Sequence, residues 1–320
     1  MRFAPPTALC DSAAMRTPNF FAETGLDRMS ERRADADWLR ALRDSADAVI
    51  LPVWKTHNLV AQVEETSRAV MLAVREVRGA IAEDTHFVFL GYRGGVPHFA
   101  VDLSHHEEPL ALPPLAGRGE FRDIRDVGLD MPRDEGALLA YSRALFHWHR
   151  THGFCGRCGA PTESRDAGHV RVCTGTGCGA QHFPRTDMAV IMLVSRGDYA
   201  LLGRKAEWPE GRFSVLAGFV EPGESLEGAV AREVMEEAGI AVRDVRYHSS
   251  QPWPFPANLM LGFFARTDTE ELRLNDRELA EARWFHRDEL IGEARAYAQR
   301  PHAVSIARRL MADWALGNEP

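Results

Sequence analysis

The chain has 320 residues, a length that predicts two domains of ordinary size. Hydrophobic residues make up 45% and charged residues 26%, a balance that excludes the disordered and collagen-like classes. The formal net charge is -8, so a broad basic surface for duplex nucleic acid is not indicated. The longest apolar run, Met188–Val194, is far shorter than the roughly 20 residues of a membrane-spanning helix. Pro5, Pro6 and Asp11 stand where a signal peptide would be apolar, so we expect a cytoplasmic protein.

The first part of the chain is expected to be β-rich. Residues 1–30 show no periodicity and predict a flexible lead before a domain over residues 31–150. In that domain, runs of strand-forming residues separated by turns such as Gly94-Gly95 predict antiparallel hairpins. The segment Asp134–His152 has the apolar spacing of an amphipathic helix. The predicted strands are Val49–Trp54, Asn58–Val63, Ala69–Val74, His86–Leu90 and Pro97–Val101.

A second domain, of mixed α/β type, is predicted over residues 185–320. Its first strand, Met188–Val194, is a continuous apolar run, as expected for a central strand covered on both faces. The elements expected after it are strand Tyr199–Leu202, helix Ser225–Ala238, strands Val242–Tyr247 and Leu259–Ala265, and helix Ala303–Leu316.

Four of the five cysteines lie within 24 residues between these domains, at Cys155, Cys158, Cys173 and Cys178, while Cys10 stands alone. Two close pairs in glycine-containing turns can direct four thiolates to one ion, which is the tetrahedral shell that Zn²⁺ accepts. The site is predicted to be structural because no ligand position is left for water. Four unrelated thiols or a disulfide are the weaker alternatives in a reducing cytosol. The flanking histidines, interpreted as packing or surface residues rather than ligands, are His147, His149, His152 and His182.

The helix predicted at Ser225–Ala238 carries an acidic face. Glu233, Glu236 and Glu237 stand at i, i+3 and i+4, so their carboxylates share a narrow sector and can be directed to one point. Clustered like charges are unfavourable without a cation, and oxygen ligands suit Mg²⁺ or Mn²⁺. Arg232 can pair with one of these carboxylates and orient it. The alternative, a solvated acidic face, would normally include lysine at i+4. The opposite, apolar face consists of Leu226, Ala229, Val230, Val234 and Ala238.

The segment Gly218–Ile240 resembles the Nudix box, because it meets every specified position of G-x5-E-x7-R-E-U-x-E-E-x-G-U, where U is aliphatic. The resemblance implies hydrolysis of a nucleoside diphosphate linked to another group, with the three glutamates and Arg232 as the catalytic set. It also implies that the backbone carbonyl of Ala217 binds metal beside these glutamates. Divalent ions suit this reaction because they neutralise phosphate oxygens and lower the pKa of the attacking water. Which carboxylate acts as the base stays open.

Three basic residues precede the helix in the same loop region. They are candidates for phosphate binding, and surface residues that aid solubility are an equally open interpretation. These residues are Arg204, Lys205 and Arg212.

The segment Ser250–Met260 alternates prolines with aromatic residues. Prolines at alternate positions fix an extended backbone outside a sheet ladder, so Trp253 and Phe255 would be presented rigidly for stacking on flat rings. From composition alone, a packed loop without a ligand is the better interpretation.

With the cysteines ahead of it, this segment resembles the SQPWPFPxS signature of the NADH pyrophosphatase branch of the Nudix family. The resemblance implies a Nudix α/β/α sandwich with a mixed sheet, preceded by a zinc ribbon over residues 151–184 and a small β-rich domain. It implies cleavage of NAD(H) into NMN(H) and AMP by a homodimer, with Glu278 as a further metal ligand. The substrate-binding residues implied are Phe183, Phe219, Gln251, Pro252, Trp253, Pro254, Phe255, Pro256, Ala257, Asn258 and Ala307.

Three departures from the branch bear on substrate preference. The second cysteine pair is spaced by four residues where relatives often have two, Asn258 replaces the final serine, and Phe183 stands where tyrosine is common. RNA capped with NAD is a further substrate candidate, because the cap contains the same pyrophosphate. The alternatives are a general Nudix hydrolase acting on ADP-ribose and a non-catalytic module whose zinc ribbon binds nucleic acid or protein. The intact glutamates count against the last.

Overall fold

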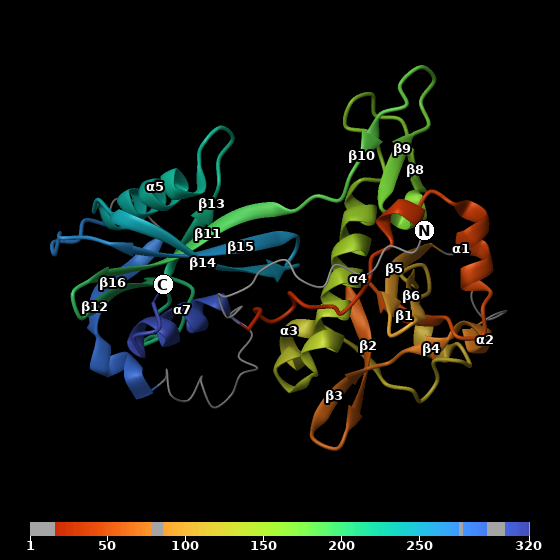
Figure 1. Ribbon diagram of the computed structural model, residues 1–320, viewed down its shortest axis with the longest axis horizontal. Coiled ribbons are helices and arrows are strands. Elements are labelled where there is room, and N and C mark those ends of the chain that lie inside the picture. Colours follow the sequence, from red (N-terminus) through yellow and green to blue (C-terminus); the bar gives the residue numbers. More distant parts are fainter. Residues whose placement is uncertain (1–16, 78–85, 275–277, 293–304, 320) are drawn as a thin grey trace, which may run out of the picture.

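The computed structural model describes residues 17–77, 86–274, 278–292 and 305–319, which form two lobes (Figure 1). Strand β11 (Asp187–Arg196) leads from the N-terminal lobe into the C-terminal lobe. A small sheet that carries the cysteines stands beside helix α4 (Arg133–Thr151) at the top of the N-terminal lobe. No helix of the described residues is long and apolar enough to cross a membrane.

The N-terminal lobe is built on a seven-stranded sheet with the order β3-β2-β1-β6-β5, with β4 paired to β1 and β7 to β2. The predicted antiparallel pairs β1–β2 and β5–β6 are confirmed, but β1 and β6 lie parallel at the centre of the sheet. Helices α1 (Ala36–Arg43), α2 (Val74–Val77) and α3 (Ile124–Val127) complete the lobe with α4. The strands are β1 Val49–Trp54, β2 His57–Val63, β3 Thr66–Ala69, β4 Leu72–Ala73, β5 Phe87–Arg93, β6 Val96–Asp102 and β7 Glu120–Arg122.

Two sequence predictions for this lobe are wrong. The segment Ala69–Val74 is not one strand, because it is divided between the end of β3, the short strand β4 and the start of α2. Its apolar character reflects the burial of Leu72 and Val74 in the core, which a run of apolar residues cannot distinguish from a strand. Residues 17–30 are not a flexible lead either, because Phe20 and Phe21 are buried in the core beside α4. Residues 1–16 lie outside the described residues.

A mixed six-stranded sheet forms the C-terminal lobe, with the order β14-β15-β11-β12-β16 and β13 paired to β11. Helices α5 (Leu226–Ala238) and α7 (Ile306–Ala315) cover its opposite faces (Figure 1). Alternate residues of the central strand β11 explain this layering: Val190, Met192 and Val194 pack with α5, while Ile191 and Leu193 pack with α7. The predicted α/β/α sandwich is therefore confirmed. The other strands are β12 Tyr199–Lys205, β13 Leu216–Phe219, β14 Arg243–Trp253, β15 Asn258–Arg266 and β16 Leu279–His286.

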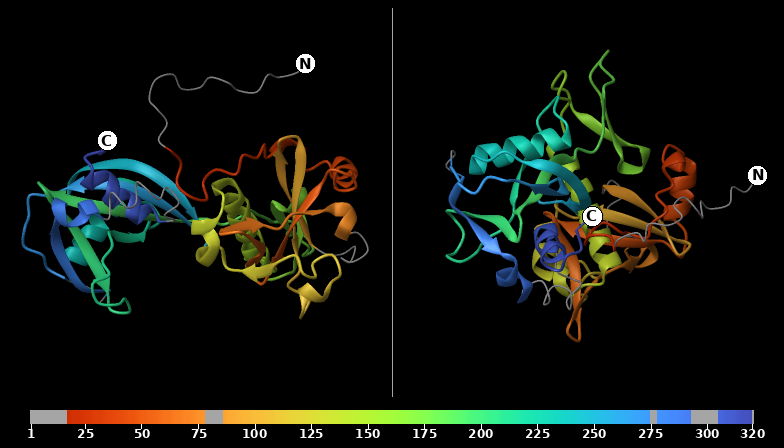
Figure 2. Two further views of the ribbon diagram at one scale, coloured as in Figure 1. Left: turned by 90° about the horizontal axis from the view of Figure 1, so that it is seen from below. Right: turned by 60° about the vertical axis from the view of Figure 1, so that its left-hand side comes forward.

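The β14–β15 hairpin reaches from the C-terminal lobe to the N-terminal lobe (Figure 2). The prediction that the proline strip lies outside a ladder is wrong for its first part, since Gln251, Pro252 and Trp253 pair with β15. Strand β14 lies at the edge of the sheet, where a proline needs no second ladder partner. Helix α7 begins after Ser305, whose hydroxyl accepts a hydrogen bond from the backbone of Ala307; predicted helix positions 303–304 lie outside the described residues.

Candidate active site and four-cysteine centre

Helix α5 is bounded by the residues that its sequence suggests. The hydroxyl of Ser225 accepts a hydrogen bond from the Gly228 N–H at 3.1 Å, which caps the first turn. Gly239 ends the helix with a positive φ of 69°, a conformation that glycine adopts without strain. The predicted apolar face, with Val230 and Val234 fully buried, packs on the sheet. The acidic face is consequently directed toward β13 and the loop that follows it.

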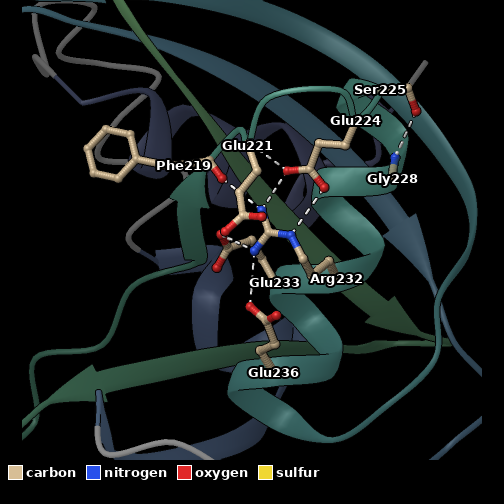
Figure 3. Close-up of polar contacts among 8 residues, drawn as sticks. All are labelled: Phe219, Glu221, Glu224, Ser225, Gly228, Arg232, Glu233 and Glu236. Carbon is tan, nitrogen blue, oxygen red and sulfur yellow. Dashed lines mark hydrogen bonds and ion pairs between the residues drawn. The ribbon is translucent and has the colours of Figure 1, made fainter.

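Arg232 is the centre of a charged network on this face (Figure 3). Its guanidinium donates to Glu224 at 2.6 and 3.1 Å, to Glu233 at 2.8 Å and to Glu236 at 3.0 Å. It also donates to the backbone carbonyl of Phe219 at 2.8 Å. These bonds raise the pKa of Arg232, with Glu224 as the main cause, and they hold the loop after β13 against α5.

Glu233 lies under this network in a crowded position. Burial raises the pKa of its carboxyl, and the charges of Glu236 and Glu278 raise it further, although Arg232 acts in the opposite direction. A Cβ placed on Gly218 would lie 1.8 Å from the carboxyl carbon of Glu233. Only glycine therefore leaves room for this carboxylate against the β13 backbone.

The three glutamates of the acidic face have different surroundings. Glu237 is 2% exposed and faces a cavity together with Ala217, whereas the Glu236 side chain is 52% exposed. Their oxygens do not converge as the cysteine sulfurs do, since among the described residues only the four cysteines bring three or more such ligand atoms within 4.8 Å of one another. Arg232 instead contacts both Glu233 and Glu236.

The donor set on α5 nevertheless fits a hard divalent ion. The carboxylates of Glu236 and Glu278 lie close enough to Glu233 for their charges to raise the pKa of the Glu233 carboxyl. A bound cation would relieve this repulsion, and carboxylate and carbonyl oxygens are its preferred ligands. Lys205, 3.8 Å from Glu278, offsets only part of the negative charge.

A cavity of about 770 Å³ lies between α5, β13, the β14–β15 hairpin and α7. Its size is within the range of small-molecule sites. Two of the three basic candidates, Lys205 and Arg212, also line it, while Arg204 bonds to Glu281 and to the carbonyl of Trp208. The predicted site residues that line this cavity are Ala217, Glu237, Gln251, Trp253 and Ala307.

Gln251 is held in the cavity wall by contacts that the sequence did not predict. Its side-chain oxygen accepts from the Ile306 N–H at 2.8 Å, at the start of α7. Its amide nitrogen donates to the Phe20 carbonyl at 3.2 Å. Gln251 is 1% exposed, so the same side chain joins β14, α7 and the N-terminal segment.

Residues 17–22, which we call the strap, form hydrogen bonds to the β14–β15 hairpin. Asn19 donates to the Ser249 hydroxyl at 2.9 Å and to the Ser250 carbonyl at 2.8 Å. Arg309 of α7 donates to the carbonyls of Thr17 and of the Asn19 side chain, at 2.6 and 2.9 Å. The available signal was a pair of aromatic residues in an otherwise aperiodic lead, which is too weak to predict these contacts.

The remaining predicted substrate residues lie outside this cavity. Phe255 packs against Phe21 and lies 5.1 and 4.7 Å from the guanidinium groups of Arg125 and Arg143. Phe219 is 58% exposed, and its ring points away from Arg232 (Figure 3). Pro256 is not among the residues that line either large cavity. A second cavity is lined by Phe183, Pro252, Pro254, Ala257 and Asn258, together with Trp253.

The four cysteine sulfurs converge in the small sheet of β8 (Thr162–Arg165), β9 (Val170–Cys173) and β10 (Gln181–His182). All four sulfurs lie within 4.8 Å of one another, with Cys155 and Cys178 3.9 Å apart and Cys158 and Cys173 3.4 Å apart. A tetrahedral zinc site with bonds of about 2.3 Å places its sulfurs roughly 3.8 Å apart. The cluster therefore has the dimensions of such a site.

The flanking histidines show how this small sheet is attached. His149 is buried, and its ring bonds to the Gly168 carbonyl at 2.8 Å and to Arg171 at 2.9 Å. Burial lowers the pKa of His149 to about 2, so the ring is neutral. His152 contacts the carbonyl of Trp148, and His182 lies 3.4 Å from the Cys155 sulfur.

Comparisons with known proteins agree along the chain. Three family models match in succession: an NADH pyrophosphatase-like rudimentary Nudix domain over residues 47–148, an NADH pyrophosphatase zinc ribbon over 150–183 and a Nudix domain over 184–308. The NAD-capped RNA hydrolase NudC of Mycobacterium bovis is 40% identical, covering 94% of this chain and 96% of the relative. The NAD-capped RNA hydrolase NUDT12 of Homo sapiens is 31% identical, covering 92% of this chain and 73% of the relative. The chain therefore belongs to the Nudix hydrolase family, in its NADH pyrophosphatase branch with a zinc ribbon.

Proposed function

We propose that the protein is a metal-dependent diphosphatase that hydrolyses the pyrophosphate of NAD(H) to NMN(H) and AMP and removes NAD caps from RNA 5′ ends. The observation that carries this function is the cavity in which Glu237 and Ala217 face the same space as Gln251, Trp253 and Ala307. The relatives named as NAD-capped RNA hydrolases, similar over almost the whole chain, support the same reaction.

The acidic face of α5 would hold Mg²⁺ or Mn²⁺ through Glu233, Glu236 and Glu237, with Glu278 and the Ala217 carbonyl as further ligands. When bound, the ion offsets the charge of the phosphate oxygens and lowers the pKa of the attacking water. Arg232 acts through the ligands, because it fixes the positions of Glu233 and Glu236 and of the loop after β13.

The cavity wall orients the dinucleotide in this proposal. Trp253 offers a rigid ring for stacking, and Phe255 packs against it with the two ring centroids 5.0 Å apart. Gln251 keeps the hairpin and α7 at a fixed separation, because its amide bonds to both α7 and the strap. Lys205 and Arg212 supply positive charge for the pyrophosphate.

We further propose that Zn²⁺ occupies the four-cysteine centre and stabilises the ribbon without taking part in the reaction. A homodimer also belongs to the proposal, and the large exposed side chains of Phe183, Phe219 and Met188 suit a protein contact. A cytoplasmic location stays a prediction from the sequence.

Product analysis tests the proposed reaction. Purified protein with Mg²⁺ or Mn²⁺ is expected to release NMNH and AMP from NADH, and NMN from NAD-capped RNA, in liquid chromatography. A chelator is expected to abolish both activities. Cleavage of ADP-ribose without cleavage of NADH, NAD or capped RNA would instead identify a general Nudix hydrolase.

A further inference from the structure

The tip of the β14–β15 hairpin carries two packed rings, Trp253 and Phe255, with different relations to the cavities. Trp253 lines the cavity of about 770 Å³ beside Glu237, and it also lines the second cavity, which has a volume of about 640 Å³. Phe255 lines neither of these two cavities. Phe255 therefore acts on a ligand in the cavities through Trp253 and not by direct contact.

The Phe255 ring packs on the N-terminal lobe. Its centroid lies 4.7 Å from the guanidinium carbon of Arg143 on α4 and 5.1 Å from that of Arg125 on α3. The ring of Phe21 in the strap meets it edge-on, with the centroids 6.1 Å apart. A cation over an aromatic ring is attracted by the electrons of the ring face, and the attraction is stronger when both groups are removed from water. These contacts join the hairpin tip to the N-terminal lobe.

Arg143 is held in place for this contact. Its side chain is 9% exposed and pairs with the Asp123 carboxylate at 3.4 Å. Burial lowers the pKa of the Arg143 guanidinium, while the charge of Asp123 acts in the opposite direction. The Arg143 Nε atom is buried and has no hydrogen-bond partner among the described residues. The Phe255 ring thus supplies part of the stabilisation that an exposed guanidinium obtains from water.

Asp123 orders the second arginine against the same ring. Its carboxylate accepts hydrogen bonds from the Arg125 guanidinium at 2.9 and 3.2 Å and from the Arg125 backbone N–H at 2.9 Å. Burial acts to raise the pKa of Asp123, but the bonds from Arg125 and the charge of Arg143 bring it below its ordinary value. The carboxylate is therefore ionised at neutral pH and holds both guanidinium groups beside Phe255.

The position of Phe255 determines that of Trp253. The centroids of these two rings lie 5.0 Å apart with the planes at 73°, and Phe21 lies 6.4 Å from Trp253 on the strap side. Because the rings pack edge against face, a shift of Phe255 would also shift or tilt the Trp253 ring. The contacts of Arg143 therefore extend, through one intervening ring, to the wall of both cavities.

We propose that Arg143 is a positioning residue for the nicotinamide end of the dinucleotide: it holds Phe255, and through Phe255 it sets the Trp253 ring for stacking. The proposal rests on the proposed function, because it gives the N-terminal lobe a part in binding NAD(H). It predicts that Arg143 matters more for NADH, which carries a nicotinamide ring, than for ADP-ribose, which ends in a ribose.

Hydrolysis of NADH and of ADP-ribose by the full chain with Arg143→Met tests this role, since methionine fills space without the charge. We expect kcat/KM for NADH to fall about tenfold, the size of a desolvated cation–π contact, mainly through a rise in KM. For ADP-ribose, kcat/KM is expected to stay within about threefold. Arg143→Lys restores a cation and should recover part of the loss for NADH. Arg150→Met is the matched control, because it makes the same change at an exposed arginine of α4.

A double-mutant cycle in thermal unfolding measures the contact without substrate. Melting temperatures of Arg143→Met, Phe255→Leu and the double variant are expected to be non-additive, because residues in contact share their effect on stability. Phe255→Leu alone is expected to show the same selective loss for NADH, so it carries the kinetic test if Arg143→Met does not fold.

Equal losses for NADH and ADP-ribose, or a fall in kcat with KM unchanged, would show a merely structural contact and overturn the proposal. Additive melting temperatures would also overturn it, since Arg143 would then not act through Phe255. If the unaltered protein cleaves ADP-ribose but not NADH, the proposed function itself fails, and the unfolding cycle still reports whether Arg143 and Phe255 are coupled.

Discussion

The two lobes have a similar arrangement of a sheet and a packed helix, and they differ in how much of that helix is buried. Each sheet has one parallel strand pair near its centre, β1 with β6 and β11 with β15. Helix α4 buries 12 of its 19 residues, whereas α5 buries 5 of its 13 residues. The difference shows that the fold alone does not make a site, because only α5 keeps a face free for a set of carboxylates.

The acidic residues of the two helices show the same contrast. On α4, Glu135 accepts hydrogen bonds from Arg68 at 2.5 Å and from the Ala69 N–H at 2.7 Å, so its carboxylate joins the helix to β3. On α5, Glu237 faces the cavity beside Ala217. The N-terminal lobe supports the site indirectly, since Arg143 of α4 packs on Phe255 at the tip of the β14–β15 hairpin.

The largest expected effect comes from the acidic face of α5. Glu237→Gln is expected to lower kcat for NADH by at least about 100-fold with little change in the melting temperature, because a ligand charge is lost while shape is kept. Glu135→Gln is the control in the other lobe, and it should lower the melting temperature while leaving kcat near normal. Steady-state kinetics and thermal unfolding of both variants test the comparison, and near-normal kcat in Glu237→Gln would contradict the role of α5.

Arg232→Lys is expected to reduce kcat by about 10- to 100-fold, the usual range for a residue that orients metal ligands. Lysine keeps the charge but cannot bond to Glu224, Glu233, Glu236 and the Phe219 carbonyl at once. Titration with Mn²⁺ should show weaker binding in step with the loss of kcat. Unchanged Mn²⁺ affinity and kcat would show that the network is only structural.

Local patterns were sufficient to predict the elements that carry the chemistry. Two such patterns each span only a few residues: the spacing of Glu233, Glu236 and Glu237, and the apolar run of β11. The helix, its acidic face and the central strand could therefore be predicted from the sequence. The contacts of the strap could not be predicted, because Asn19 and its partner Ser249 are 230 residues apart and such a contact produces no periodic pattern in the sequence. The rudimentary Nudix character of the first lobe was also missed, since its long helix α4 carries no set of glutamates at i, i+3 and i+4.

A smaller effect is expected from a substitution in the strap, which connects the two lobes. Asn19→Ala removes the bonds to Ser249 and Ser250, worth about 1 kcal/mol each in net terms. We expect KM for NADH to rise about fivefold with kcat little changed, because the cavity wall moves while the carboxylates stay in place. Asn19→Asp, which keeps an acceptor for Arg309, is the companion variant and should restore part of the loss. A fall in kcat alone would contradict a positioning role.

The smallest expected effect concerns pH. Burial lowers the pKa of His149 to about 2, against about 6.5 in an unfolded chain. Below pH 6.5 the unfolded state binds a proton at His149 that the folded state does not bind. The contribution of the neutral, buried His149 to the free energy of unfolding is therefore present above pH 6.5 and is lost progressively as pH falls below that value. Thermal unfolding between about pH 7 and pH 5 should show a steeper decline for the unaltered protein than for His149→Gln. Parallel declines would show that His149 does not contribute.

The central claim is that α5 holds divalent ions at the cavity wall where the pyrophosphate of NAD(H) is split. A crystal soaked in Mn²⁺, examined by anomalous scattering, tests it most directly. Anomalous peaks are expected between Glu233, Glu237 and the Ala217 carbonyl. Absence of any peak there, in crystals of protein that cleaves NADH with Mn²⁺ in solution, would contradict it.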